Sequence, residues 1–163
     1  MAQEQLLSLS EYKQARSISV FLSMPGREIG TASVVDDALQ SGKRVFVPYI
    51  YQAPSQQDGR KGASVMDMLL LRSMEDCQSL EPDKWGIPSI SNDSVPSREN
   101  CFGGMGLTNG ETPSEDSSGL DVIVMPAMSF DHELNRLGHG KAYYDNFVKR
   151  CCSHNRRKPF LGM

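Results

Sequence analysis

Two short apolar runs with a helical pattern between them limit the fold of this chain more than any other feature of its sequence. The first run, residues 17–23, reads SISVFLS, which is typical of a buried strand. After it, Thr31 can cap a helix and Gly42 can end it. The apolar residues of that helix share one face: Val34, Val35, Ala38 and Leu39. Residues 43–48 (KRVFVP) predict a second strand, so the order strand, helix, strand predicts a parallel pair with a right-handed crossover.

The same alternation returns later in the chain. Residues 65–73 (VMDMLLLRS) predict a third strand that lies deep in a sheet, and residues 120–125 predict a central strand. Pro159 marks the start of another strand. After Lys141, apolar residues at helical spacing predict a helix: Tyr143, Tyr144, Phe147, Val148 and Cys151. We therefore expect an α/β fold of three layers, with a mostly parallel sheet and helices on both faces.

Residues 89–119 interrupt this pattern. They are rich in Ser, Asn, Gly, Pro and Glu and show no apolar period, which predicts a long, mobile surface loop. The residues just before them, 85–88 (WGIP), predict a brief extended piece. A chain of 163 residues has the length of one domain, and we expect a single domain over residues 1–163.

Composition excludes several classes of protein. The net charge of −3 gives no overall attraction for nucleic acid or for an anionic membrane, so any anion site must be local. The apolar runs are too short to cross a bilayer, and residues 1–17 lack the pattern of a secretory signal. The four cysteines form no C-x-x-C pair and the three histidines show no paired ligand spacing. We expect reduced thiols, no transition-metal site and a cytoplasmic protein, with the mitochondrion as the alternative.

Residues 135–145 (NRLGHGKAYYD), named here the signature segment, lie between the predicted central strand and the helix after it. Ligands of open parallel sheets bind beyond the carboxyl ends of the strands, which is where this segment falls. Gly138 and Gly140 allow a sharp bend and a close approach of the backbone to a ligand. The start of a helix also attracts phosphate. Three residues supply potential cations: Arg136, His139 and Lys141.

The end of the signature segment adds aromatic rings and a carboxylate. Tyr143 and Tyr144 can present one ring to a flat heterocycle and bury the other in the core. Asp145 can bind a magnesium ion that bridges phosphates. Together these features predict a nucleoside triphosphate beside an aromatic substrate. The structural alternative is a glycine-containing loop with solvated basic residues and tyrosines in the core.

At this segment the sequence resembles the 5-formyltetrahydrofolate cyclo-ligase (methenyltetrahydrofolate synthetase) family. The family signature is similar to N-R-L-G-R-G-K/G-G-Y-Y-D, and the segment matches it at all but two positions. Companion segments resemble further parts of the family in the expected order: SEYKQARSISVFLSM, EIGT, MDM, WGIP and DVIVMPAMSFD. The similarity extends over about residues 10–162, apart from the loops.

The resemblance implies a ligase of folate (one-carbon) metabolism that uses ATP and Mg²⁺. Such an enzyme converts 5-formyltetrahydrofolate to 5,10-methenyltetrahydrofolate, ADP and phosphate. Phosphorylation of the formyl oxygen makes it a good leaving group, and N10 then attacks the formyl carbon. The protein supplies alignment and charge neutralisation. Its partners would be these two substrates, and we expect a monomer that binds neither nucleic acid nor membrane.

The resemblance also implies which residues bind. For ATP they are Arg136, Leu137, Gly138, His139, Gly140, Lys141, Ala142, Tyr143 and Tyr144. For the folate they are Leu22, Glu28, Met66, Met68, Trp85, His139, Gly140, Lys141, Ala142 and Tyr143. The catalytic residues would be His139, Lys141 and Tyr143, and Asp145 would bind Mg²⁺. Without the resemblance, Glu28 would be a charge at a helix entry and the two methionines and Trp85 would be core residues.

Two positions of the signature segment depart from the family pattern. His139 replaces the usual Arg, which keeps a hydrogen-bond donor but loses a permanent charge. Ala142 replaces a usual Gly, and because alanine favours helix, we expect the helix to begin slightly earlier.

The family pattern also has a basic helix before, and a strand with a Mg²⁺-binding Asp after, the segments found in this chain. The resemblance therefore implies a domain truncated at both ends. Two alternatives stay open beside the ligase. One is a truncated, non-catalytic folate- or nucleotide-binding protein of the same fold, and the other is a related nucleotide-binding α/β protein with another substrate.

Overall fold

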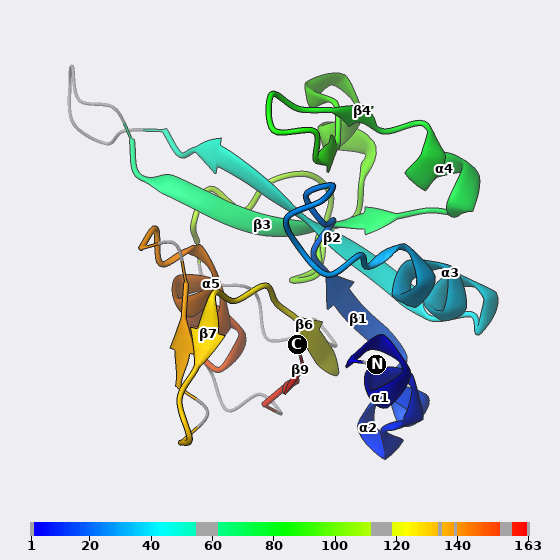
Figure 1. The fold of residues 1–163 in the computed structure, drawn as a ribbon. Helices are drawn as coiled ribbons and strands as arrows, with labels where there is room; N and C mark the ends of the chain where they lie inside the picture. The colour runs from blue at the N-terminus through cyan, green and yellow to red at the C-terminus, as the bar shows by residue number, and fades with distance from the viewer. Residues whose placement is uncertain are drawn as a thin grey trace.

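A five-stranded sheet runs through the protein in the order β3-β2-β1-β6-β9 (Figure 1). The structure, a computed structural model, describes residues 2–54, 62–111, 119–133, 135–138, 140–153 and 158–162. The strands are β1 (Ser17–Val20), β2 (Arg44–Gln52), β3 (Ser64–Leu71), β6 (Val122–Val124) and β9 (Phe160–Gly162). Three of the four strand pairs are parallel, and only β2 and β3 pair antiparallel. The predicted α/β fold with a mostly parallel sheet is therefore confirmed.

Helices cover both faces of this sheet. They are α1 (Ala2–Ser8), α2 (Ser10–Gln14), α3 (Ala32–Gln40), α4 (Met74–Gln78), the 3₁₀-helix η1 (Asn92–Ser97) and α5 (Tyr143–Cys151). On one face, side chains of α1, α2 and α3 pack on β1 and β2 and form the first core cluster. On the other face, Phe147 of α5 packs with Phe46 and Met68 in the second core cluster. Figure 1 shows α5 beside β3, away from α3. Two short hairpins complete the fold: β4 (Glu81–Pro82) with β5 (Pro88–Ser89), and β7 (Ser129–Phe130) with β8 (Arg136–Leu137).

The predicted strand–helix–strand unit is present, since β1 and β2 are parallel and α3 joins them. Gly42 follows α3 with a φ of +72°, as a helix-ending glycine should. Thr31 stands at the N-cap, but its hydroxyl donates to the Phe21 carbonyl oxygen at 2.6 Å instead of bonding the first turn of the helix. Thr31 therefore connects the start of α3 to the residue after β1. The predicted helix-capping hydrogen bond is not formed.

The prediction that residues 65–73 lie deep in the sheet is wrong, because β3 is an edge strand. Most of its residues are nevertheless buried, since a later segment pairs with its open edge. Leu70 donates its N–H to the Glu99 carbonyl oxygen at 2.8 Å, and the Cys101 N–H bonds the Met68 carbonyl oxygen at 3.0 Å. The run of apolar residues in β3 is thus explained by the segment around residues 99–101, which pairs with the outer edge of this strand.

Residues 89–119 were predicted to be a long, mobile surface loop, and the surface position is wrong for the described part, residues 89–111, because this part is packed. This part contains η1 and buries Val95, Cys101 and Phe102. It also buries Arg98, whose guanidinium forms a bidentate pair with Asp76 at 2.7 Å. A packed segment can thus rely on polar side chains that find partners, which leaves no apolar period in the sequence. Residues 112–118 of the predicted loop lie outside the described residues.

The remaining element predictions are mostly correct. Val122–Val124 form a central strand between β1 and β9, and β9 follows Pro159 as expected. The helix with apolar residues at helical spacing is α5, which buries Phe147 and Cys151. The extended piece at 85–88 is wrong in part, because Trp85 and Gly86 lie in the turn between β4 and β5 and only Pro88 starts a strand.

Candidate functional site

The candidate site lies beyond the carboxyl ends of β1 and β6. These neighbouring strands are parallel, with Val20 opposite Val124, so the segments that follow them leave the sheet at the same edge. Residues 21–31 follow β1 and residues 125–142 follow β6. The signature segment belongs to the second of these, as its position after a central strand predicted.

The β7–β8 hairpin shapes the first part of the signature segment. The Asp131 carboxylate accepts hydrogen bonds from the N–H groups of Glu133 at 2.9 Å and Asn135 at 2.8 Å. It also accepts the Asn135 side-chain amide at 2.8 Å, and this bond is the main reason why the pKa of Asp131 lies below its ordinary value. The Met128 N–H donates to the Leu137 carbonyl oxygen at 2.8 Å, which aligns the two strands. The hairpin therefore fixes the backbone position from which the Arg136 side chain extends.

The Arg136 side chain is only 12% exposed and is held on three sides. Its Nη1 donates to the Pro126 carbonyl oxygen at 2.8 Å, and its Nη2 lies 3.3 Å from the Asp145 carboxylate. The guanidinium also lies 5.5 Å from the centre of the Tyr144 ring, within cation–π range. A positive charge is thus fixed beside the start of α5, where the helix dipole is also positive.

The middle of the signature segment depends on backbone freedom. A Cβ at Gly138 would lie 2.9 Å from Arg136 Nη1, so a side chain there would displace the guanidinium. Gly140 has a φ of +78°. His139 lies outside the described residues, and Lys141 is exposed.

Ala142 is the N-cap residue of α5 and has left-handed backbone angles, φ +54° and ψ +20°. The prediction that alanine lets the helix begin earlier is therefore wrong, since α5 begins at Tyr143. The loop geometry overrides the high helix propensity of alanine at this position. No side chain among the described residues caps α5, so its first turn offers N–H groups to a ligand.

The two tyrosines have different surroundings. The Tyr143 hydroxyl lies 3.0 Å from Ser64 Oγ, at the start of β3. Tyr144 packs against both core clusters. Burial raises the pKa of Tyr144; the negative charge of Glu28 raises it further and Arg136 opposes both. Glu28, Arg136 and Tyr144 therefore share one electrostatic neighbourhood, although Glu28 lies in the loop after β1 and the other two residues lie in the signature segment.

The residues predicted for the folate differ in exposure and in surroundings. Glu28 is half-buried, and its carboxylate accepts the Met24 N–H at 2.7 Å. Leu22 packs against the first core cluster. Met66 and Met68 are buried in the second core cluster, whereas Trp85 is 60% exposed.

The Trp85 turn lies close to the loop that contains Glu28. A Cβ on Gly86 would lie 3.7 Å from Pro25 Cδ, so these two turns are neighbours. Trp85 donates its backbone N–H to the Asp83 carboxylate at 2.8 Å, which holds its turn in place. The β1 loop and the β4–β5 turn are thus neighbours, and through Glu28 the β1 loop also acts on Tyr144 of the signature segment.

The described residues contain no cluster of three or more His, Cys, Asp or Glu side chains that could hold a metal. Asp145 offers a single carboxylate and its side chain is 57% exposed. Mg²⁺ in nucleotide sites often takes one or two carboxylates, phosphate oxygens and waters, so one exposed carboxylate beside an uncapped helix start has the chemistry that this ion needs.

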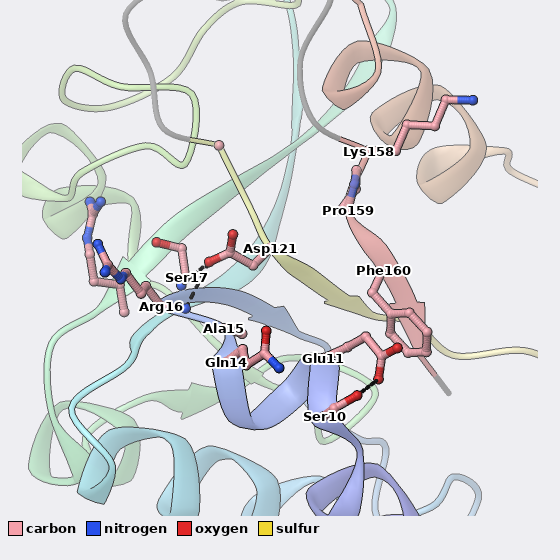
Figure 2. Close-up of a pocket in the computed structure, with 12 residues that line it drawn as sticks. Ser10, Glu11, Gln14, Ala15, Arg16, Ser17, Asp121, Lys158, Pro159 and Phe160 are labelled. Carbon is pink, nitrogen blue, oxygen red and sulfur yellow. Dashed lines mark hydrogen bonds between the residues drawn. The ribbon is translucent and has the colours of Figure 1, made fainter.

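A cavity of about 1020 Å³ lies at the opposite edge of the sheet (Figure 2). Its walls come from α2 and from the amino ends of β1, β2, β6 and β9, and they carry both signs of charge. The charged residues are Glu11, Arg16, Arg44, Asp121 and Lys158. The Asp121 carboxylate accepts the Arg16 N–H at 2.8 Å and so serves the backbone. This cavity is far from the carboxyl edge and contains none of the predicted site residues.

Sequence reasoning missed residues that support the site. Ser64 contacts Tyr143, and nothing in the sequence distinguished this serine from others. Asp67 is fully buried and paired with Arg150 of α5 at 3.0 Å. A signal for Asp67 did exist, since it is the one charged residue in the apolar run VMDMLLL.

Known proteins resemble this chain in sequence and in fold. A profile of the 5-formyltetrahydrofolate cyclo-ligase family matches residues 1–162. The chain is 32% identical over 157 residues to the 5-formyltetrahydrofolate cyclo-ligase of Mus musculus, which covers 96% of this chain and 65% of that protein. It is 30% identical over 149 residues to the probable 5-formyltetrahydrofolate cyclo-ligase of Schizosaccharomyces pombe, over 90% of this chain and 58% of that protein.

A solved structure with a similar fold is the NMR structure of Aquifex aeolicus 5,10-methenyltetrahydrofolate synthetase. The TM-score is 0.53 at 21% identity, over 93% of this chain and 60% of that one. The chain thus spans 65% and 58% of the length of the two curated relatives. Among the described residues, no helix has the length and apolar character needed to cross a membrane.

Proposed function

Because the chain belongs to the 5-formyltetrahydrofolate cyclo-ligase family, we propose that it catalyses the ATP- and Mg²⁺-dependent cyclisation of 5-formyltetrahydrofolate to 5,10-methenyltetrahydrofolate. ADP and phosphate would be released. The observation that carries this proposal is the arrangement around Arg136: a guanidinium held beside the uncapped start of α5, at the carboxyl edge of a parallel sheet. The partners of the protein would be 5-formyltetrahydrofolate and ATP, and the protein would act as a monomer.

The chemistry requires the formyl oxygen to become a leaving group. That oxygen would attack the γ-phosphorus of ATP, forming an O–P bond while the bond to the β-phosphate bridging oxygen breaks and ADP leaves. N10 would then attack the formyl carbon and lose its proton. The bond between that carbon and the phosphorylated oxygen would break, which releases phosphate. Both steps gain most from alignment and from neutralisation of phosphate charge.

The signature segment has the groups for this task. Arg136, Lys141 and the free N–H groups of α5 would bind the phosphates, because each supplies positive charge or donors. Gly138 and Gly140 would let the backbone come close, and Leu137, Ala142 and Tyr144 would complete the ATP site. His139, Lys141 and Tyr143 would face the formyl group as the catalytic residues.

Asp145 would hold Mg²⁺ through its carboxylate. The carboxylate is exposed and its contact to Arg136 is long, 3.3 Å at the nearest, so it can exchange this partner for a cation. When bound, the ion would neutralise charge on the transferring phosphate.

The folate would lie against the walls formed by the β1 loop and the β4–β5 turn. Glu28 would accept hydrogen bonds from the amino and ring N–H groups of the pterin, and exposed Trp85 offers an apolar surface beside it. Leu22, Met66 and Met68 would contribute apolar surface. Because Met66 and Met68 are buried, they would contact the folate only after a local rearrangement.

The proposal is tested by following the absorbance of methenyltetrahydrofolate with 5-formyltetrahydrofolate, ATP and Mg²⁺. We expect a signal that requires all three and disappears with EDTA. Isothermal calorimetry with each substrate alone separates the alternatives. Folate binding without turnover would favour a non-catalytic binding protein, and ATP binding without folate binding would favour another substrate. The cytoplasmic location stays a prediction, which cell fractionation against a mitochondrial marker can check.

A further inference from the structure

A fully buried carboxylate connects the helix of the signature segment to the sheet. Asp67 lies in β3 between Met66 and Met68, and its side chain is 0% exposed. Thr108 donates to it from its N–H at 2.7 Å and from its hydroxyl at 2.9 Å. The side chains of Asn100 at 3.2 Å and Tyr51 at 3.1 Å donate as well. This carboxylate is thus saturated with partners, as burial of a charge requires.

The partner of opposite charge comes from α5. Arg150 Nη1 lies 3.0 Å from the Asp67 carboxylate and also donates to the Met66 carbonyl oxygen at 3.1 Å. Its Nη2 donates to the Thr108 hydroxyl, and the guanidinium lies 4.7 Å from the centre of the Phe102 ring. One side chain of the helix therefore fixes the β3 backbone at Met66 and the side chain of the next residue.

Arg150 and Tyr143 lie on the same face of α5, about two turns apart. Tyr143 contacts Ser64 and Arg150 contacts Met66 and Asp67, so both ends of the helix are attached to β3. One of these attachments is at the signature segment, and the other is beside Met66 and Met68, which the family resemblance assigns to the folate. A shift at the buried pair would change the distance between these two parts of the site.

We propose that Asp67, through Arg150, is a positioning residue that sets the start of α5 and the Met66–Met68 part of β3 at the separation needed for phosphoryl transfer to the formyl oxygen. This inference rests on the proposed function. Neither side chain needs to touch a substrate. The cost of a wrong separation is a loss of alignment in the bound complex, because a small shift can leave both substrates bound while it misplaces the formyl oxygen relative to the γ-phosphorus of ATP.

A buried pair can also serve stability alone, so the test needs a matched control. Arg98 and Asp76 supply one, since they form a bidentate pair at 2.7 Å with side chains 4% and 14% exposed. Arg98 also donates to a β3 carbonyl oxygen, that of Leu70, at 2.8 Å. This pair joins η1 and α4 to the far end of β3 and makes no contact with α5 in the described residues. Asp76→Asn therefore removes a comparable buried charge without removing any contact to α5.

The experiment compares Asp67→Asn, Arg150→Met, the double variant and Asp76→Asn with the parent chain, at a temperature where circular dichroism shows each to be folded. The asparagine is nearly isosteric with aspartate, so it keeps the hydroxyl partners. Hydrogen–deuterium exchange is measured over 143–151, and kcat and KM are measured for both substrates per folded molecule. Arg150→Lys, which keeps the charge, should recover part of each effect.

We expect Asp67→Asn and Arg150→Met to speed exchange in α5 about tenfold or more, with Asp76→Asn close to the parent. We also expect kcat to fall about 10- to 100-fold with little change in either KM, and the double variant to match the worse single one. Unchanged exchange in α5, or equal loss of kcat in Asp76→Asn, would overturn the proposal. If the parent shows no turnover, the proposed function fails, whereas the exchange data still decide whether this pair positions α5.

Discussion

Replacement of Ala142 by glycine should stabilise the protein, although the same change in most places destabilises. Ala142 has a φ of +54° and a ψ of +20°, in the left-handed region, and is one of two non-glycine residues with positive φ among the described residues. Its methyl group conflicts there with the following carbonyl oxygen. Ala142→Gly removes that conflict and leaves the start of α5 where it is.

Two opposing terms set the magnitude. The left-handed conformation costs an L-residue about 1–2 kcal/mol, which glycine does not pay. Glycine loses more backbone entropy on folding, which costs about 0.5–1 kcal/mol relative to alanine. The net gain in the free energy of unfolding is therefore about 0.5 kcal/mol. For a chain of this size that gain should raise Tm by about 1–2 °C.

A second alanine provides the control for this small effect. Ala127, exposed and just beyond β6, is absent from the positive-φ residues of the described part of the chain. Ala127→Gly should therefore lose about 0.4–1 kcal/mol through entropy alone. In urea unfolding, the free energies of unfolding of the two variants should differ by about 1–1.5 kcal/mol. If Ala142→Gly loses as much as Ala127→Gly, the left-handed geometry at the start of α5 is wrong.

Three further predictions follow from the site and the core. Arg136→Met should weaken ATP binding about 10- to 100-fold by calorimetry, because it removes charged hydrogen bonds, while the folate affinity stays the same; an equal loss for both ligands would contradict the proposed role. Burial raises the pKa values of Tyr12, Tyr51 and Tyr144, so these should ionise above the ordinary pH of about 10 in an alkaline absorbance titration. Since the folded-state pKa of these tyrosines is raised, their contribution to stability is present below pH of about 10 and is lost above it. If all five tyrosines ionised together in the native protein, this prediction would be wrong. Burial also raises the pKa of the Cys101 thiol, so thiol labelling followed by mass spectrometry should modify Cys101 only on unfolding, and rapid native labelling would show that residues 98–106 do not cover β3.

The sequence predicted best what local patterns decide. The β1–α3–β2 unit has apolar runs of strand length, a helical apolar face and a helix-ending glycine, and all of these signals lie within a few residues of the elements they define. The site at the carboxyl edge followed from the position of the signature segment after a central strand. Residue roles in this segment came from the family resemblance and remain proposals.

What the sequence could not show depends on partners that are distant along the chain. The edge position of β3 depends on which strand lies next to β2, and its burial depends on the segment around Glu99 and Cys101. That segment packs through Arg98 and Asn100, whose polar side chains carry no hydrophobic period. Burial of such residues is visible only once Asp76 and Asp67 are found opposite them.

The left-handed angles of Ala142 also explain why the signature segment can keep Lys141 beside a helix start. If the helix began at Lys141, as alanine propensity suggests, a cation would occupy its first turn, where the helix dipole is positive and repels it. With α5 beginning at Tyr143, the first turn carries Asp145, whose negative charge is favourable there. Lys141 then lies outside the helix, next to its N–H groups, where a bound phosphate would separate the positive charges. The strain at Ala142 is thus the local cost of placing a cation and a carboxylate on the correct sides of one helix start.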